Sequence, residues 1–239
     1  PQISPDGKSI ATIESGTVAL RRLDQLQPRE LHLPWKVTLM FGGPGFSRDG
    51  RTLVILDDGD GDLWRVPVDG GEPQLVTRLP QKGFLWGVTA LGDDQILFGM
   101  ADGGLFRVAL RGGDPVVVLA AGEGEAFAAP HVLPNGRDIL FAEINRGRIE
   151  AFDGSKRTVV LEIEKSRIFE PKYSASGHLL FRRDGGDRGV WAVGFTPATL
   201  TTSGTPFRVL PYGWYSLATD DTLVFQENAS RANPARLVW

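Results

Sequence analysis

A tight turn followed by a hydrophobic strand recurs along this chain at a nearly constant interval. The clearest copies read "ISPDGKSIATI", "FSRDGRTLVIL" and "VLPNGRDILFA", and three weaker copies lie between and after them. Measured at the second position of the strand, the intervals are 43, 43, 43, 40 and 44 residues. The anchor residues are Ala11, Val54, Leu97, Leu140, Leu180 and Val224. A regular period of this length indicates a repeat architecture.

Each repeat contains four short strand patterns separated by turn residues. Asp-Gly and Asn-Gly supply the left-handed backbone of the first turn, and Gly70-Gly71 and Gly112-Gly113 supply that of the third. Four strands in about 43 residues, repeated radially, predict an all-β, six-bladed β-propeller of four-stranded antiparallel blades in a single domain. The predicted blades are 1–35, 36–79, 80–122, 123–163, 164–209 and 210–239.

The last repeat stops after its third strand, so we expect the sixth blade to be incomplete. An incomplete blade leaves an unpaired strand edge, which proteins normally cover. Edge pairing of this blade with another chain is therefore one possible contact.

Composition excludes several classes of function. The chain has 239 residues, no cysteine and a net charge of −3, with Lys and Arg scattered along it. A nucleic-acid partner is not expected, because phosphate binding needs a basic face. The lack of cysteine excludes disulfides, thiolate metal sites and a cysteine nucleophile. We find no run of 18 apolar residues, so no membrane span is expected.

The repeats resemble a known family. "ISPDGKSIA", "FSRDGRTLVI", "DLWRVPVDGGEPQLV" and "HVLPNGRDILFAE" look like TolB-like (WD40-like) propeller repeats. The second half, with "YSASGHLLF", "GTPF" and the final "LVW", is most similar to the propeller region attached to bacterial eukaryotic-like serine/threonine kinases. The resemblance implies a recognition or sensor module of a larger bacterial protein, located outside the cytoplasm, and identifies no catalytic residue. The sequence contains no HRD, DFG or glycine-rich kinase motif.

The stretch "LDDGDGDLW" resembles the beginning of a calcium loop. Asp58, Asp60 and Asp62 alternate as such ligands do, but the sixth position is Leu63 instead of glycine and flanking helices are not expected. The corresponding stretches of the other repeats join the same two strands. We interpret this stretch as an acidic hairpin of the second blade, with Ca²⁺ as the alternative and no other cofactor expected.

Catalytic constellations are weak. The sequence has no G-x-S-x-G motif, and Ser47 of "GFSRDG" aligns with Ser4 of the repeated turn. His131 and Glu170 lie on opening strands of neighbouring blades, where they are expected to line the channel. One histidine and one carboxylate do not make a metal site.

Aromatic and arginine side chains, which are enriched at binding hot spots, gather in the loops that enter the opening strands and in those that follow the second strands. These loops share one face of a propeller. The candidate partner-binding residues are Trp35, Trp86, Arg167, Arg183, Tyr212, Trp214 and Tyr215. The alternative is that Trp86 and Trp214 pack between blades.

The favoured hypothesis is a non-catalytic recognition or sensor propeller whose mouth binds a protein, a peptide or a small ligand. A hydrolase-type or peptidase-associated propeller, lactonase-like, with an axial metal or gating role is the first alternative. A structural assembly subunit is the second alternative.

Overall fold

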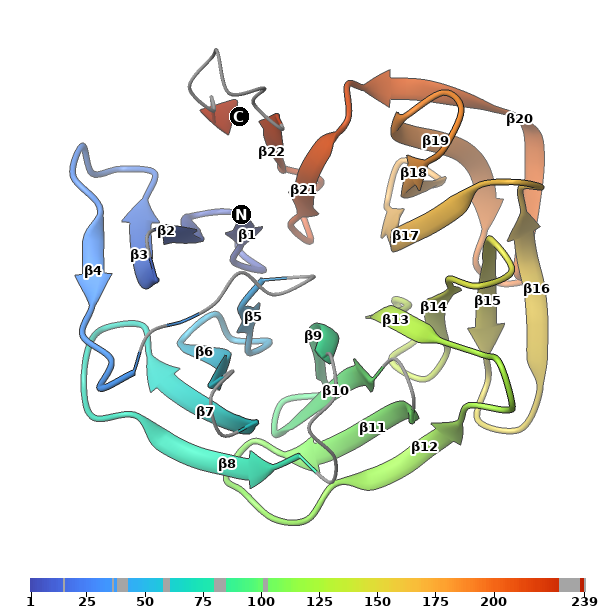
Figure 1. Ribbon diagram of the computed structural model, residues 1–239. Helices are drawn as coiled ribbons and strands as arrows, with labels where there is room; N and C mark the ends of the chain where they lie inside the picture. Colours follow the sequence, from blue (N-terminus) through green and yellow to red (C-terminus); the bar gives the residue numbers. More distant parts are fainter. Residues whose placement is uncertain are drawn as a thin grey trace.

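The computed structural model of this chain is an all-β propeller. It describes residues 1–239 except 15, 36, 38–42, 58–60, 80–84, 101–102, 228–236 and 239, and of 227, 237 and 238 it describes the backbone only. Figure 1 shows five four-stranded antiparallel sheets and a smaller three-stranded sheet arranged around a centre. The predicted propeller of four-stranded blades is thus confirmed for five blades. None of the described segments forms a helix with the length and hydropathy needed to cross a membrane.

Within every sheet the strands follow one another in chain order, from the centre outward. The first three sheets consist of β1 (Gln2–Ile3), β2 (Ser9–Glu14), β3 (Thr17–Arg22) and β4 (Arg29–Leu31); β5 (Gly45–Phe46), β6 (Thr52–Asp57), β7 (Asp62–Pro67) and β8 (Gln74–Arg78); and β9 (Leu85–Leu91), β10 (Gln95–Met100), β11 (Gly104–Ala109) and β12 (Val116–Ala120). The others are β13 (Phe127–Val132), β14 (Ile139–Glu143), β15 (Arg148–Phe152) and β16 (Arg157–Glu162); β17 (Arg167–Ser174), β18 (His178–Asp184), β19 (Gly189–Thr196) and β20 (Thr201–Leu210); and β21 (Gly213–Leu217), β22 (Leu223–Glu227) and β23 (Leu237–Val238).

The turn between the first and second strands is built from its own side chains. In the second sheet, Ser47 Oγ donates to Asp49 at 2.6 Å and accepts the Thr52 amide at 3.0 Å. Gly50 in the same turn has a φ of 70°, which a non-glycine residue rarely adopts. Ser4 and Gly7 repeat this arrangement in the first sheet. A short local motif therefore fixes where each inner strand ends.

The core lies between neighbouring sheets. Val54 and Leu63 of the second sheet, for example, pack with Ile96 and Phe98 of the third. The middle strands are apolar on both faces because each sheet is covered on two sides. Burial of this apolar surface is the main favourable term in folding.

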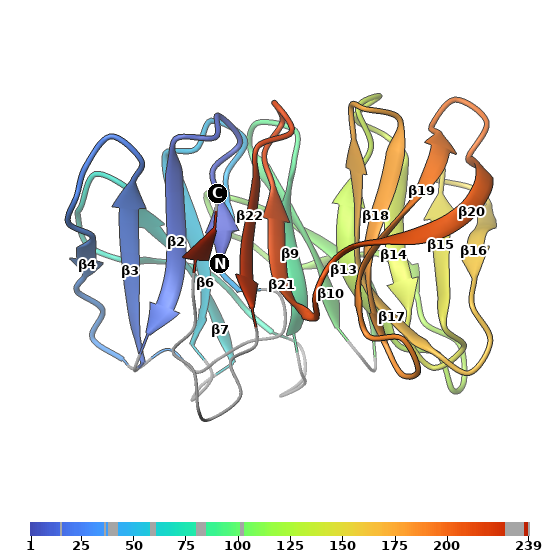
Figure 2. The same cartoon turned by 90° about the horizontal axis from the view of Figure 1, so that it is seen from above.

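The first and last sheets meet and close the ring. Ile3 and Ile10 form one buried cluster with Ala218 and Val224. Two hydrogen bonds tie the same elements: the Ile3 amide donates to Ser216 Oγ at 3.1 Å, and the Thr219 amide donates to the Pro5 carbonyl at 3.1 Å. Figure 2 shows β22, the last strand drawn in full, standing between β2 and β21.

The closure contact should carry measurable stability. Ile3 is 5% exposed, so Ile3→Ala should lower the free energy of unfolding by about 2–5 kcal/mol, through lost burial and the cavity left behind. Leu26 is 88% exposed, so Leu26→Ala is the matched control and should change it by less than about 0.5 kcal/mol. Urea unfolding monitored by tryptophan fluorescence measures both. Equal values for the two variants would contradict a closure through Ile3.

Candidate functional site

The inner strands bulge at one repeated position. Gly87, Ala129 and Glu170 occupy equivalent places in β9, β13 and β17, and all three have positive φ values, of 98°, 48° and 54°. The pairing register with the second strand shifts at or beside each of them. A bulge of this kind re-aims the side chains that follow it, and bulges are frequent next to functional sites.

One residue from each inner strand, at an equivalent register position, lines a central cavity; in β9, β13 and β17 this residue lies two positions after the bulge. We call this set the channel ring; it consists of Gln2, Gly45, Thr89, His131, Lys172 and Ser216. The cavity has a volume of about 450 Å³, within the usual range for ligand sites. It also touches the first-to-second-strand turns, at Arg48, Pro134, Ala175 and Thr219. We call this end of the channel the turn mouth and the opposite end the loop mouth.

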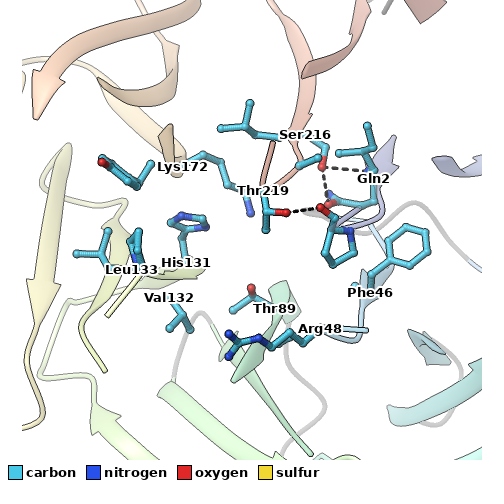
Figure 3. A pocket seen from close by; sticks show the side chains of 18 of the residues that line it. Gln2, Phe46, Arg48, Thr89, His131, Val132, Leu133, Lys172, Ser216 and Thr219 are labelled. Carbon is cyan, nitrogen blue, oxygen red and sulfur yellow. Dashed lines mark hydrogen bonds between the residues drawn. The ribbon is translucent and has the colours of Figure 1, made fainter. Parts of the chain in front are cut away.

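The two halves of the channel ring differ in their hydrogen bonding. Ser216 Oγ donates to Gln2 Oε1 at 3.1 Å and accepts the Ile3 amide, so this half serves ring closure. Thr89, His131 and Lys172 point into the cavity from three consecutive sheets (Figure 3). Within the described part of the chain, none of these three side chains makes a hydrogen bond or an ion pair. They are polar groups presented to whatever occupies the cavity.

Enclosure in the channel shifts the protonation equilibria of His131 and Lys172. Burial, helped by the charge of Lys172, lowers the pKa of His131 to about 3, so its imidazole is neutral at pH 7. Burial also lowers the pKa of Lys172, and the negative charge of Glu170 opposes that shift. Enclosure away from water thus disfavours both protonated forms, and for Lys172 the charge of Glu170 offsets part of this effect.

Glu170, predicted to line the channel, belongs to a closed cluster between this cavity and the loop mouth. Its carboxylate lies 3.3 Å from Nε of Arg182, and both side chains are buried. Burial raises the pKa of Glu170, and Arg182 opposes the shift. The Arg182 guanidinium lies 3.9 Å from the ring centre of Trp214 and donates to the Tyr212 hydroxyl at 3.3 Å.

Tyr215 completes this cluster. It is 2% exposed, and its hydroxyl donates to the Glu170 carbonyl. Burial raises the pKa of Tyr215 well above its usual value. Of the predicted partner-binding residues, Tyr212, Trp214 and Tyr215 therefore already make contacts inside the protein.

Other predicted partner-binding residues surround the loop mouth. Trp35 packs on Trp64 with ring centres 4.7 Å apart, and Trp86 stacks on Phe169 at 5.8 Å. The first pair joins the loop after the first sheet to the second sheet, and the second pair joins the third and fifth sheets. Such packing is expected of large apolar side chains.

The two predicted arginines differ in exposure. Arg183 lies over Trp191 at 5.2 Å and donates to Ser166 Oγ at 3.0 Å. Arg167 begins β17 with its side chain exposed. Arg167 is therefore the most accessible of the predicted partner-binding residues.

The acidic stretch is only partly covered by the structure. Asp58 and Asp60 lie outside the described residues. Asp62 is buried at the start of β7, with Arg78 Nε 3.8 Å from its carboxylate. Among the residues that the structure describes, no three His, Asp or Glu side chains are grouped closely enough to hold a metal ion. The Ca²⁺ alternative stays a prediction.

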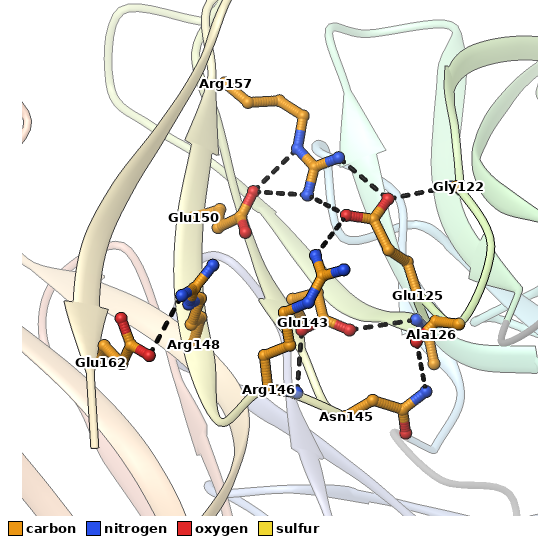
Figure 4. Close-up of polar contacts among 11 residues, drawn as sticks. Gly122, Glu125, Ala126, Glu143, Asn145, Arg146, Arg148, Glu150, Arg157 and Glu162 are labelled. Atoms are coloured by element: carbon orange, nitrogen blue, oxygen red, sulfur yellow. Dashed lines mark hydrogen bonds and ion pairs between the residues drawn. The ribbon is translucent and has the colours of Figure 1, made fainter. Parts of the chain in front are cut away.

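An ion-pair network anchors the loop that leads into β13. Arg157 forms two hydrogen bonds of 2.9 Å to Glu125 and also contacts Glu150, and Arg146 pairs with Glu125 at 2.9 Å (Figure 4). The hydrogen bonds from Arg157 are the main reason why the pKa of Glu125 falls to about 2. The network holds the start of the strand that carries His131.

Comparison with known proteins supports the fold. The chain matches no protein-family model and no curated protein. Among solved structures it is similar to TolB from Agrobacterium tumefaciens, with 21% identity over 93% of this chain and 86% of that chain and a TM-score of 0.70. It is also similar to a chain of a nidogen/laminin complex, with 17% identity over 92% of this chain and 86% of that chain and a TM-score of 0.69. For an oligogalacturonate lyase in complex with manganese, the identity is 14% over 98% of this chain and 74% of that chain, with a TM-score of 0.63. Identities this low show a shared β-propeller fold.

The neutral state of His131 can be measured. Because its folded-state pKa of about 3 is below the ordinary 6.5, the unfolded chain takes up a proton first as the pH falls. Its contribution to stability is thus complete above pH 6.5 and is lost as the pH falls toward 3. Side-chain ¹⁵N NMR should show an unprotonated His131 at pH 5. Unfolding free energy should decrease less steeply between pH 6.5 and 4.5 in His131→Gln than in wild type. A midpoint near 6.5 for His131 would contradict this prediction.

Proposed function

We propose that this chain is a non-catalytic recognition propeller that binds a segment of a partner protein, or a small ligand, in the cavity at the turn mouth. The observation that carries the proposal is the channel ring, where the three polar side chains of Thr89, His131 and Lys172 face the cavity without internal partners. We further propose that the three-stranded sheet acts as a sixth blade.

The contacts at the two ends favour the turn mouth over the loop mouth. Trp35, Trp86 and Trp214 each have a ring contact inside the protein, with Trp64, Phe169 and Arg182, respectively. Arg167 remains available for a second contact at the loop mouth, and with the other predicted residues there it stays a weaker candidate for partner binding.

A binding role also agrees better with the surroundings of His131 than a hydrolytic one. In a serine hydrolase the histidine base is oriented by a carboxylate. Here the charged neighbour that acts on the His131 imidazole is Lys172, a cation. Nidogen/laminin is a protein complex, whereas oligogalacturonate lyase is an enzyme, so the fold accommodates both classes of function.

The proposed biological setting is based on the family that the sequence resembles. Similarity to kinase-associated propellers supports a sensor or interaction region of a larger bacterial protein, placed outside the cytoplasm. Edge pairing of the sixth blade is a separate proposal for a contact with another chain.

A peptide-selection experiment tests which mouth recognises a partner. Ala175 is exposed at the rim of the cavity, and Trp in its place should cover the opening. Peptides selected from a random library on the wild-type protein should bind Ala175→Trp at least tenfold more weakly by fluorescence polarisation. The matched control is Glu123→Trp, an exposed position in a loop at the other mouth, which should bind them like wild type. Equal binding by Ala175→Trp, or loss in Glu123→Trp alone, would reject the turn mouth.

A further inference from the structure

We propose that the ligand of this cavity enters through a single carboxylate group, held by the Lys172 ammonium with hydrogen bonds from His131 and Thr89. The inference deepens the proposed function and rests on it, because it names the chemistry that the turn mouth recognises. It concerns the ligand's charged group, and the rest of the ligand lies along the apolar side chains of the cavity.

The geometry brings three donors to one side of the channel. Thr89, His131 and Lys172 hold the same position in β9, β13 and β17, which are neighbouring inner strands. A threonine hydroxyl, a neutral imidazole N–H and an ammonium can all donate to one pair of carboxylate oxygens. Figure 3 shows the three side chains directed into the cavity from that side.

The other charged side chains at or near the cavity each have a hydrogen-bond or ion-pair partner. At the rim, Nε of Arg48 lies 3.6 Å from Asp93, and Asp221 accepts the Ala175 amide at 3.0 Å. Deeper in the channel, Glu170 is paired with Arg182. Among the described residues that line the cavity, Lys172 is therefore the charged side chain that makes no hydrogen bond or ion pair, although the negative charge of Glu170 also acts on it.

One ammonium without a hydrogen bond or ion pair matches a ligand with one negative charge. A charge enclosed away from water is costly unless it is paired, so a monoanion stabilises Lys172 while Lys172 stabilises the monoanion. A phosphate dianion would bring a second negative charge that His131 does not meet, because the burial that lowers the pKa of His131 keeps its imidazole neutral. The charge balance favours a carboxylate over a phosphate.

Apolar side chains also line the cavity, on the strands that carry the donors as well as on the other inner strands. Phe46, Val88 and Val132 line the cavity, together with Ile3 and Leu217. Such a surface suits a short aliphatic tail next to the carboxylate. A peptide C-terminus with an aliphatic last residue and a small aliphatic acid share this chemistry, and the experiment separates these two sources.

The test uses butyrate, butyramide, inorganic phosphate, and N-acetyl-Ala-Val as free acid and as amide. Binding is followed by calorimetry and by the side-chain ¹⁵N signals of His131. Both free acids should shift the His131 signals saturably, whereas the two amides and phosphate should bind at least tenfold more weakly. Tighter binding of the dipeptide acid than of butyrate identifies a peptide C-terminus, and the reverse order identifies a small acid.

Variants assign the charge. Lys172→Met keeps a long side chain without charge and should weaken binding of the free acids at least tenfold, while Lys172→Arg should retain part of it. The matched control is Lys156→Met, in an exposed turn outside the cavity, which should bind as wild type. Backbone NMR spectra of each variant verify its fold. If Lys172→Met does not fold, Lys172→Arg and the comparison of each acid with its amide test the proposal.

The proposal is overturned if the amides bind like the acids, if phosphate binds as tightly as butyrate, or if folded Lys172→Met binds like wild type. These failures are distinct from failure of the proposed function. If peptides bind Ala175→Trp more weakly but bind wild type equally as acids and as amides, recognition at the turn mouth is retained and the carboxylate proposal is rejected. If peptides bind Ala175→Trp as tightly as wild type, the proposed recognition site at the turn mouth is rejected.

Discussion

Contact between the first and last sheets is the interaction on which the rest of the structure depends. Each sheet buries its two faces against neighbours, so an open ring would expose the apolar faces of both terminal sheets. Ile3, Ser216 and Thr219 make the closing contacts, and all three residues also line the cavity. The binding site and the stability of the fold therefore share the same residues, and loosening the closure would deform one side of the cavity.

Strain in the inner strands is the second requirement. Ala129 and Glu170 hold left-handed conformations that cost a non-glycine residue about 1–2 kcal/mol each. Glu170 is held there by the buried contact with Arg182 and by the hydroxyl of Tyr215. The cluster of aromatic residues around Arg182 thus supports the bulge that turns Lys172 toward the channel. Side chains expected at a partner-binding mouth instead fix the geometry of the cavity.

Local signals explain why the repeat pattern could be predicted and the site could not. Turn residues and alternating hydrophobicity act over a few residues, so the blades can be read from sequence. The partner of Trp35 is Trp64 of the next sheet, and the cation beside His131 is Lys172 of another, so neither is visible in a local pattern. Aligning "GPGF", "APHV" and "EPKY" from the second, fourth and fifth repeats would have revealed that Gly45, His131 and Lys172 share one position.

Symmetry of the fold and asymmetry of the site have a common origin. Six equivalent positions surround the cavity, but the junction of the chain's two ends uses the hydrogen bonds of Gln2 and Ser216, and Gly45 contributes no side chain. Among the described members of the channel ring, the polar side chains without a hydrogen bond or ion pair thus lie on β9, β13 and β17. A ring closed by non-covalent contacts between its terminal blades necessarily has one side committed to closure. Recognition is then left to the other inner strands, where Lys172 is the charged side chain that makes no hydrogen bond or ion pair among the described residues that line the cavity.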